Sequence, residues 1–205
     1  KTGMAVWQAK QACPRLITVP PDYKLYLHFS KMLRKIYENY SDRVESFGLD
    51  KCWIDLTNRN FSLRDGWNSA HEIRQLVKAQ LGITVSVGVS YNKIFAKLGS
   101  DLKKPDAVTM ISPTDFMQTI WELPACDLLY VGPKTTQKLR EMNILTIGDL
   151  ACASSDRLKY KLGRNGLMLQ AFAQGWDQAP VMHTTAEEAI RSVGNSTTTP
   201  HDIAN

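Results

Sequence analysis

The 205-residue sequence lacks the patterns that mark small metal-binding and disulfide-rich proteins. Its four cysteines lie far apart and form no CxxC pair, which disfavours a zinc site and a disulfide framework. Each cysteine has apolar neighbours in the chain, so the sequence predicts reduced, packed thiols in a cytosolic protein. The cysteines are Cys13, Cys52, Cys126 and Cys152.

Long apolar runs are also missing. No stretch approaches the roughly 20 apolar residues that a membrane-spanning helix needs, and no signal peptide is apparent. We therefore expect a cytoplasmic protein with no membrane partner. The sequence starts at Lys1 without an initiator Met, which indicates an internal piece of a longer chain.

The composition is that of a globular protein with a modest basic excess. Hydrophobic residues make up 43% and charged residues 22%, enough apolar material for one large or two small domains. Lysine and arginine number 25 against 20 aspartates and glutamates, giving a net charge of +5. That excess permits a polyanionic partner without requiring one.

The first half of the chain predicts an α+β layer in which helices pack on a sheet. Apolar residues at three- and four-residue steps favour a helix over 22–40, and residues 44–57 are strand-like with an interruption near Gly48. Ser69 and Glu72 form a capping box that favours a helix ending at Leu81, before Gly82. Further along, the pattern predicts a strand over 83–90, a helix over 92–102 and a strand over 108–111.

After Ser112-Pro113 the strand patterns end. Short helical pieces joined by glycines and prolines predict a small all-α domain that ends near Val181. The stretch from 190 to 205 is polar and rich in threonine after one short apolar patch.

The segment from Phe47 to Thr57 is the first candidate for chemistry. Asp50 stands at a hairpin bend beside an apolar strand, where a carboxylate could bind a hard cation. Aspartate beside glycine is also a common turn residue, and the spacing alone favours that interpretation. Asp55 lies within the second arm, where it could face solvent or pair with a cation.

The second candidate is the basic helix from Asn92 to Leu102 and the lysines after it. Lys93 and Lys97 are one helical turn apart, and Lys104 precedes Pro105, where the helix has ended. Ammonium groups placed in this way can bind a triphosphate and stabilise charge developing on it. The alternative is an ordinary solvated basic face.

The third candidate is the turn at Gly132-Pro133. A glycine turn that opens a helix exposes unpaired N–H groups, and the helix dipole favours an anion there. Thr135 adds a hydroxyl, while Lys134 and Lys138 extend the positive face. DNA phosphate is the obvious ligand, and such contacts are independent of base sequence. A purely structural helix–turn–helix connection fits these residues equally well.

Taken together and in this order, the motifs resemble the Y-family DNA polymerases, the DinB/UmuC group also called ImpB/MucB/SamB. The most specific part runs from Val85 to Pro105. Tyr130 departs from the pattern, since it stands where the thumb's helix-hairpin-helix has its first glycine. The other matching pieces are Lys1-Thr2-Gly3-Met4, Asp50-Lys51, Trp53-Ile54-Asp55-Leu56-Thr57, Tyr130-Val131-Gly132-Pro133 and Arg191-Ser192-Val193-Gly194-Asn195-Ser196.

The resemblance implies a palm, an antiparallel sheet with helices on one face, followed by a small all-α thumb with a helix-hairpin-helix. Residues 1–21 would then close the fingers region, 22–112 form the palm without its first strand, and 113–183 form the thumb. Residues 184–205 would link to the little-finger domain.

The implied activity is error-prone, template-directed nucleotide addition across damaged DNA, in DNA repair and damage tolerance. Primer–template DNA and a deoxynucleoside triphosphate are the implied partners, and a sliding clamp is a further candidate. Two Mg²⁺ ions held by three palm carboxylates would carry the phosphoryl transfer. Asp50 matches one of the carboxylates, and Lys104 matches the family lysine that touches the triphosphate. Gly132, Lys134, Thr135 and Lys138 would bind DNA.

Lys51 departs from the family, which has glutamate at this position. The change removes a metal ligand and places an ammonium group beside the cation, a repulsion of about 1 kcal/mol in water at ~4 Å and several-fold more in a drier cleft. We therefore expect this chain as given to have no polymerase activity.

Two other functions fit parts of the sequence. A non-catalytic DNA-binding protein could keep palm and thumb as a scaffold. A helix-hairpin-helix repair or nuclease module would explain Gly132-Pro133 but would leave the stretch from Val85 to Pro105 unexplained, and the sequence offers no separate set of metal ligands for it.

Overall fold

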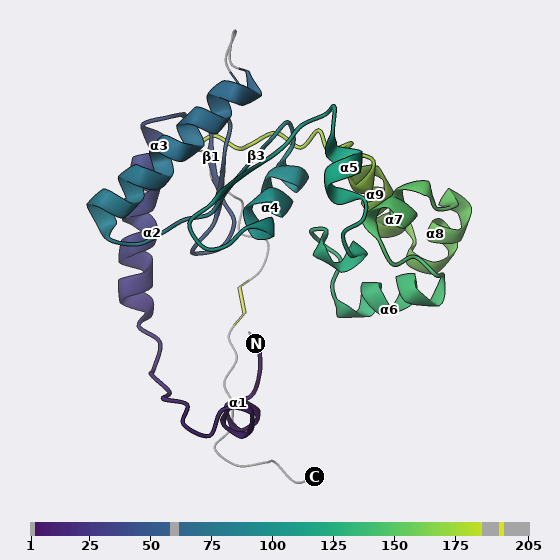
Figure 1. Cartoon of the computed structure of the whole chain (residues 1–205), viewed down its shortest axis with the longest axis horizontal. Helices are drawn as coiled ribbons and strands as arrows, with labels where there is room; N and C mark the ends of the chain where they lie inside the picture. Colours follow the sequence, from purple (N-terminus) through teal and green to yellow (C-terminus); the bar gives the residue numbers. More distant parts are fainter. Residues whose placement is uncertain (1–2, 58–61, 186–192, 195–205) are drawn as a thin grey trace.

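The computed structural model describes residues 3–57, 62–185 and 193–194. Two segments of the family resemblance, 1–4 and 191–196, therefore lie partly outside the described residues. Figure 1 shows two groups of elements: α2, α3 and α4 gather around the strands, and α5 to α9 form a second group beyond α4.

The two N-terminal helices are α1 (Val6–Ala12) and α2 (Tyr23–Glu38). The predicted helix over 22–40 is confirmed in α2, where the Asp22 carboxylate accepts a hydrogen bond from the Leu25 N–H at 3.0 Å. Ile36 is buried on the inner side of α2 and packs with Ile73 and Val77 of α3.

The predicted hairpin is confirmed as β1 (Val44–Ser46) and β2 (Cys52–Ile54), which pair antiparallel with Ser46 opposite Cys52. The Phe47 N–H donates to the Lys51 carbonyl at 2.8 Å and closes the turn. Gly48 takes a φ of +78° in this turn, a conformation that glycine adopts without steric cost.

Helix α3 (Leu63–Leu81) begins earlier than the sequence predicted. The capping box is Ser62 with Asp65, not Ser69 with Glu72: the Asp65 carboxylate accepts from the Ser62 N–H at 2.9 Å. The helix extends to this first box because it buries an inner face that already includes Gly66. The predicted end is confirmed, since Gly82 caps the helix in the left-handed conformation.

Strand β3 (Val87–Ser90), helix α4 (Lys93–Leu102) and strand β4 (Val108–Ile111) form a β–α–β unit. The helix and the last strand match the sequence prediction, whereas β3 is shorter than the predicted 83–90. The prediction of an antiparallel sheet is confirmed for β1 and β2 but is wrong for β3 and β4, which pair parallel. The physical reason is the connection between the strands. Helix α4 carries the chain back to the end of the sheet where β3 began, so that β4 runs in the same direction as β3.

The predicted all-α part is confirmed as α5 (Phe116–Ile120), a 3₁₀ turn (Ala125–Asp127), α6 (Pro133–Glu141), α7 (Ile147–Cys152), α8 (Ser155–Leu162) and α9 (Arg164–Ala173). Its core is continuous with α4 and β4, because Phe95, Leu98 and Ile111 belong to the same buried cluster as Ile120 and Leu150. The smaller cluster of Ile36, Ile73 and Val77 is separate.

The cysteines are free thiols, as predicted, but the prediction that they are packed is wrong for three of them. Cys13, Cys126 and Cys152 are exposed, and Cys52 is half-buried. Apolar neighbours in the chain do not guarantee burial, because consecutive residues point in different directions. Among the described residues, no helix has the length and apolar content to cross a membrane.

Candidate functional site

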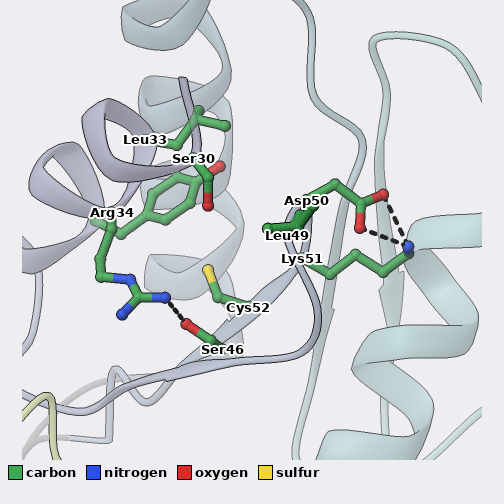
Figure 2. Close-up of a pocket in the computed structure, with 9 residues that line it drawn as sticks. Ser30, Leu33, Arg34, Ser46, Leu49, Asp50, Lys51 and Cys52 are labelled. Carbon is green, nitrogen blue, oxygen red and sulfur yellow. Dashed lines mark hydrogen bonds and ion pairs between the residues drawn. The ribbon is translucent and has the colours of Figure 1, made fainter. Parts of the chain in front are cut away.

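The hairpin bend presents Asp50 and Lys51 to solvent beside α2 (Figure 2). The Lys51 Nζ donates to both carboxylate oxygens of Asp50, at 2.9 and 2.8 Å. The two side chains are 41% exposed for Lys51 and 72% for Asp50. The lysine thus occupies the two oxygens that the sequence analysis assigned to a cation.

The electrostatics of Asp50 follow from this contact. The hydrogen bond from Lys51 lowers the pKa of Asp50 more than partial burial raises it, and the charges of Lys51 and Lys104 lower it further. The structure therefore brings Lys104 within electrostatic reach of the hairpin bend, although the two residues are far apart in sequence. Both were predicted as site residues.

Lys104 itself is engaged. Its Nζ lies 2.7 Å from one oxygen of Asp101, and Lys97 pairs with the other oxygen of the same carboxylate. Burial alone would raise the pKa of Asp101, but the hydrogen bonds and charges of the two lysines lower it overall. Lys104 remains about half-exposed, so it is accessible from solvent.

The two helical lysines proposed for phosphate are not solvated. The side chain of Lys93 is 14% exposed and that of Lys97 13% exposed, and each ends on a carboxylate, Glu45 and Asp101. Lys93 therefore fits neither of the two interpretations given for it, a phosphate-binding lysine or a solvated one. Its ammonium is paired with Glu45 inside the protein.

A pocket between the hairpin and α2 contains residues that the sequence analysis missed. Arg34 of α2 donates to the Ser46 hydroxyl on its wall, and burial raises the pKa of the Cys52 thiol to about 12. The sequence showed Arg34 only as a polar position of an amphipathic helix. The lining residues are Ser30, Leu33, Arg34, Tyr37, Ser46, Leu49, Asp50, Lys51 and Cys52.

Three of the four predicted DNA-binding residues line one groove of the all-α part. Lys134, Thr135 and Lys138 line it from α6, where Gly132 is the N-cap and Pro133 the first helical residue. The opposite wall, which the sequence analysis missed, comes from α8 and α9 and adds a third lysine, Lys161, and an amide, Asn165. Its residues are Lys161, Leu162, Asn165, Met168 and Leu169.

Tyr130 is at the edge of the same groove. It has a φ of +71°, a left-handed conformation that costs a non-glycine residue roughly 1–2 kcal/mol. The residue is 56% exposed, and its ring lies 6.3 Å from that of Phe172. The left-handed φ is one that glycine adopts without steric cost, which is consistent with the glycine that the family resemblance predicts here.

Metal binding finds little support at the hairpin. Within residues 3–57, 62–185 and 193–194, no three His, Cys, Asp or Glu side chains gather as a metal site would require. Asp50 alone, with an ammonium on both of its oxygens, does not fit a pair of Mg²⁺ ions.

Two protein-family models match the chain. The impB/mucB/samB family matches residues 1–101, and the thumb domain of DNA polymerase iota matches residues 127–177. The chain belongs to the Y-family DNA polymerases. The first segment contains α1 to α3, the strands β1 to β3 and nearly all of α4, and the second contains α6 to α9.

Related proteins and structures agree. The chain is 54% identical over 205 residues to DNA polymerase IV of Acetivibrio thermocellus and 39% identical over 202 residues to DNA polymerase IV 1 of Bacillus subtilis. These matches cover 100% and 98% of this chain but 51% and 48% of the relatives, so the chain spans about half the length of the curated relatives it matches.

Among solved structures, DinB from Sulfolobus solfataricus is 29% identical with a TM-score of 0.81, over 89% of this chain and 54% of that chain. The insertion ternary complex of Dbh DNA polymerase is 29% identical with a TM-score of 0.80, over 88% and 53% of the two chains. The palm-and-thumb architecture predicted from the sequence is therefore confirmed.

Proposed function

We propose that this chain is the palm and thumb of an error-prone translesion DNA polymerase that binds primer–template DNA. The observation that carries the proposal is that residues of the family's motifs come together in the structure. The charge of Lys104 lowers the pKa of Asp50, and the lysines of the thumb line one groove. Relatives named DNA polymerase IV support the same activity for the parent protein.

The thumb groove would bind the DNA backbone. Gly132 leaves the N-terminus of α6 open, so that a phosphate can reach the free N–H groups. Lys134, Thr135 and Lys138 would add charge and a hydroxyl from one wall, and Lys161 charge from the other. Contacts of this kind bind any base sequence.

Nucleotide addition would require more than this chain offers. In the parent protein, two Mg²⁺ ions would be held by carboxylates that include Asp50, and Lys104 would leave Asp101 to contact the triphosphate of the incoming nucleotide. Here Lys51 neutralises Asp50, so we propose that the chain as given binds DNA without extending a primer. A sliding-clamp partner and a cytoplasmic location belong to the same proposal for the parent.

The alternative of a non-catalytic DNA-binding protein is favoured by one observation, the ion pair between Lys51 and Asp50. The two functions differ in what Lys51→Glu would do within the full-length parent. Metal-dependent primer extension by that variant supports a polymerase whose acidic motif has been altered. Its absence, with DNA binding retained, supports a scaffold.

DNA binding is tested on the 205-residue chain by fluorescence anisotropy with a labelled primer–template duplex. The affinity should fall steeply as salt rises, and a double variant, Lys134→Glu/Lys138→Glu, should bind more weakly and with a shallower salt dependence. The matched control is Lys31→Glu/Lys35→Glu, the same charge reversal on exposed positions of α2.

Two results would count against the proposal. Equal weakening by the control pair would show that net charge, not the groove, determines affinity. Template-dependent incorporation of nucleotides by the unmodified chain would contradict the proposed lack of activity.

A further inference from the structure

The segment that follows α9 returns to the hairpin of the palm. In Figure 1 this segment, drawn in yellow, leaves α9 and runs back across the molecule toward β1. We name residues 175–184 the return segment. It is joined to the palm by hydrogen bonds between residues that lie 83 to 142 positions apart in the chain.

We propose that Asn92 and Lys93 are positioning residues that fasten the return segment to the palm, Asn92 at the start of α4 and Lys93, through Glu45, at the β1–β2 hairpin. These contacts between the return segment and the palm are called the joint below. The joint requires neither DNA nor metal, so its role goes beyond the proposed function.

Lys93 and Glu45 form an enclosed ion pair. The Lys93 Nζ lies 2.6 Å from the Glu45 Oε1, and the two side chains are 14% and 17% exposed. The same ammonium lies 4.5 Å from the ring centroid of Trp53, whose indole N–H donates to the Lys93 carbonyl at 2.9 Å. A pair withdrawn from water in this way is costly to break from one side, because the remaining charge would be left without a partner.

The ion pair has spare hydrogen-bonding capacity, and the return segment uses it. The second oxygen of Glu45 accepts the Met182 N–H at 2.9 Å, while the Lys93 Nζ also donates to the Pro180 carbonyl at 3.4 Å. One lysine and one glutamate thus supply a donor and an acceptor to the same short stretch of backbone.

Asn92 fastens the beginning of the return segment. Its Oδ1 caps α4 by accepting the Phe95 N–H at 2.8 Å, and its Nδ2 donates to the Gly175 carbonyl at 3.0 Å. At the other end, the Thr184 N–H and hydroxyl donate to the Asp42 carbonyl at 2.9 and 2.8 Å. The return segment is therefore held at its start, middle and end.

The joint lies on the same hairpin as the candidate site. Glu45 is on β1 and Trp53 on β2, the two strands that hold the bend with Asp50 and Lys51. A displacement of the thumb that pulled on the return segment would therefore act on the same hairpin. Lys93 determines where that hairpin lies relative to the chain leaving the thumb.

The test is amide hydrogen exchange by NMR on the 205-residue chain, without DNA. In the unmodified chain the Met182 and Thr184 amides should be protected. Lys93→Met removes the partner that positions Glu45 and the hydrogen bond to the Pro180 carbonyl. The exchange rate of the Met182 amide should therefore rise by about tenfold or more, as the loss of a hydrogen bond from a charged group implies. The Val87 amide, which donates to the Ala107 carbonyl at 2.9 Å within the parallel sheet, reports on the global fold and should change much less.

Two further variants separate positioning from simple stability. Lys93→Arg keeps the cation and should restore most of the protection at Met182. Lys93→Met/Glu45→Met removes both charges, which proteins often tolerate without loss of stability, but it also removes the acceptor, so Met182 should exchange freely while Val87 stays protected.

The proposal is overturned by any of three results. These are an unprotected Met182 amide in the unmodified chain, unchanged Met182 exchange in a folded Lys93→Met or double variant, and equal changes at Met182 and Val87 in every variant.

Discussion

At the scale of single residues, position 51 determines what the hairpin bend can bind. The Lys51 ammonium contacts both oxygens of Asp50, so this carboxylate is already neutralised by its own neighbour. The position is exposed, and therefore the ion pair contributes little to folding. Its importance is chemical.

Lys51→Glu should raise the pKa of Asp50. The substitution removes the hydrogen bond and the positive charge that lower this pKa, and it adds a second carboxylate whose charge disfavours ionisation of the first. A carbon-13 NMR titration of the Asp50 carboxyl should show a higher midpoint in the variant. Lys51→Gln, without charge, should give an intermediate value; a midpoint that stayed at the native value in both variants would contradict the ion pair.

Gly132→Ala should separate DNA binding from folding. A Cβ at this position would meet nothing within 4 Å, and the residue has a φ of −80°, which alanine adopts readily. The free energy of unfolding should therefore stay within about 0.5 kcal/mol of the native value. Affinity for primer–template should fall, because the methyl group would stand where a phosphate approaches the start of α6. Unchanged affinity in the anisotropy assay would show that Gly132 takes no part in DNA binding.

At the scale of elements, the contact between β3 and α4 leaves no room for a side chain. A Cβ on Gly88 would lie 1.8 Å from the Ala96 carbonyl oxygen and 2.5 Å from the Ser100 nitrogen, both backbone atoms that cannot move aside alone. Gly88→Ala should therefore destabilise the protein by more than about 3 kcal/mol, as severe overpacking does. Urea denaturation measures the loss, and Gly132→Ala serves as the matched control.

Helix α7 has a capping box whose cost on removal should depend on pH. The Asp149 carboxylate accepts the Leu145 and Thr146 N–H groups at 2.9 Å, and these hydrogen bonds lower the pKa of Asp149. A carboxyl whose pKa is lower in the folded state stabilises the fold above its unfolded pKa and loses this contribution as pH falls through the folded pKa.

Asp149→Ala should therefore cost about 1 kcal/mol at pH 7, with a loss that shrinks below about pH 4. Ser154→Ala, at the N-cap of α8, is the control, because its hydroxyl accepts the Arg157 N–H at 3.5 Å and does not titrate. Its cost should be the same at both pH values. Urea denaturation of both variants across this range would show whether the two costs diverge.

The elements also show how far sequence reasoning reaches. Local signals located the cap at Gly82, the helix over 92–102 and the strand over 108–111, because each depends on residues within a few positions. The start of α3 was placed wrongly since Ser62 and Ser69 both begin plausible boxes, and burial of the helix face decides between them. The fate of Lys93 could not be predicted, because its partner lies 48 positions away.

The site followed the same division. Asp50, Lys104 and the residues of α6 were predicted because the family motifs name them, and their roles stay predictions. Arg34 and Lys161 were missed because only the tertiary fold brings them to the hairpin and to the groove.

At the scale of the whole molecule, the two buried clusters do not follow the predicted boundary between residues 112 and 113. Phe95 of α4 is fully buried, and its ring lies 5.3 Å from that of Phe116 in α5. The core of the thumb thus includes a helix of the palm. Packing of this shared core, as well as the chain connection, determines how the two parts are placed relative to each other.

Substitutions in the two clusters should have separate effects. Phe95→Ala should cost about 3–5 kcal/mol and raise hydrogen exchange in α4 and in the thumb helices. Ile73→Ala should cost about 2–5 kcal/mol, with faster exchange confined mainly to α2 and α3. A variant that accelerated exchange equally in both clusters would show that the chain opens only as one unit.

The route of the return segment also determines how the molecule would carry mechanical load. In an optical trap, tension applied through a handle attached at Thr184 would reach Glu45 and Asp42 of the palm before it reached α9. The force would first act on the hydrogen bonds between the return segment and the palm, and the thumb would carry no tension until those bonds broke. A first, small extension would mark the release of the return segment from the palm, before the larger extension from unfolding of the thumb. This first extension should disappear in Lys93→Met/Glu45→Met.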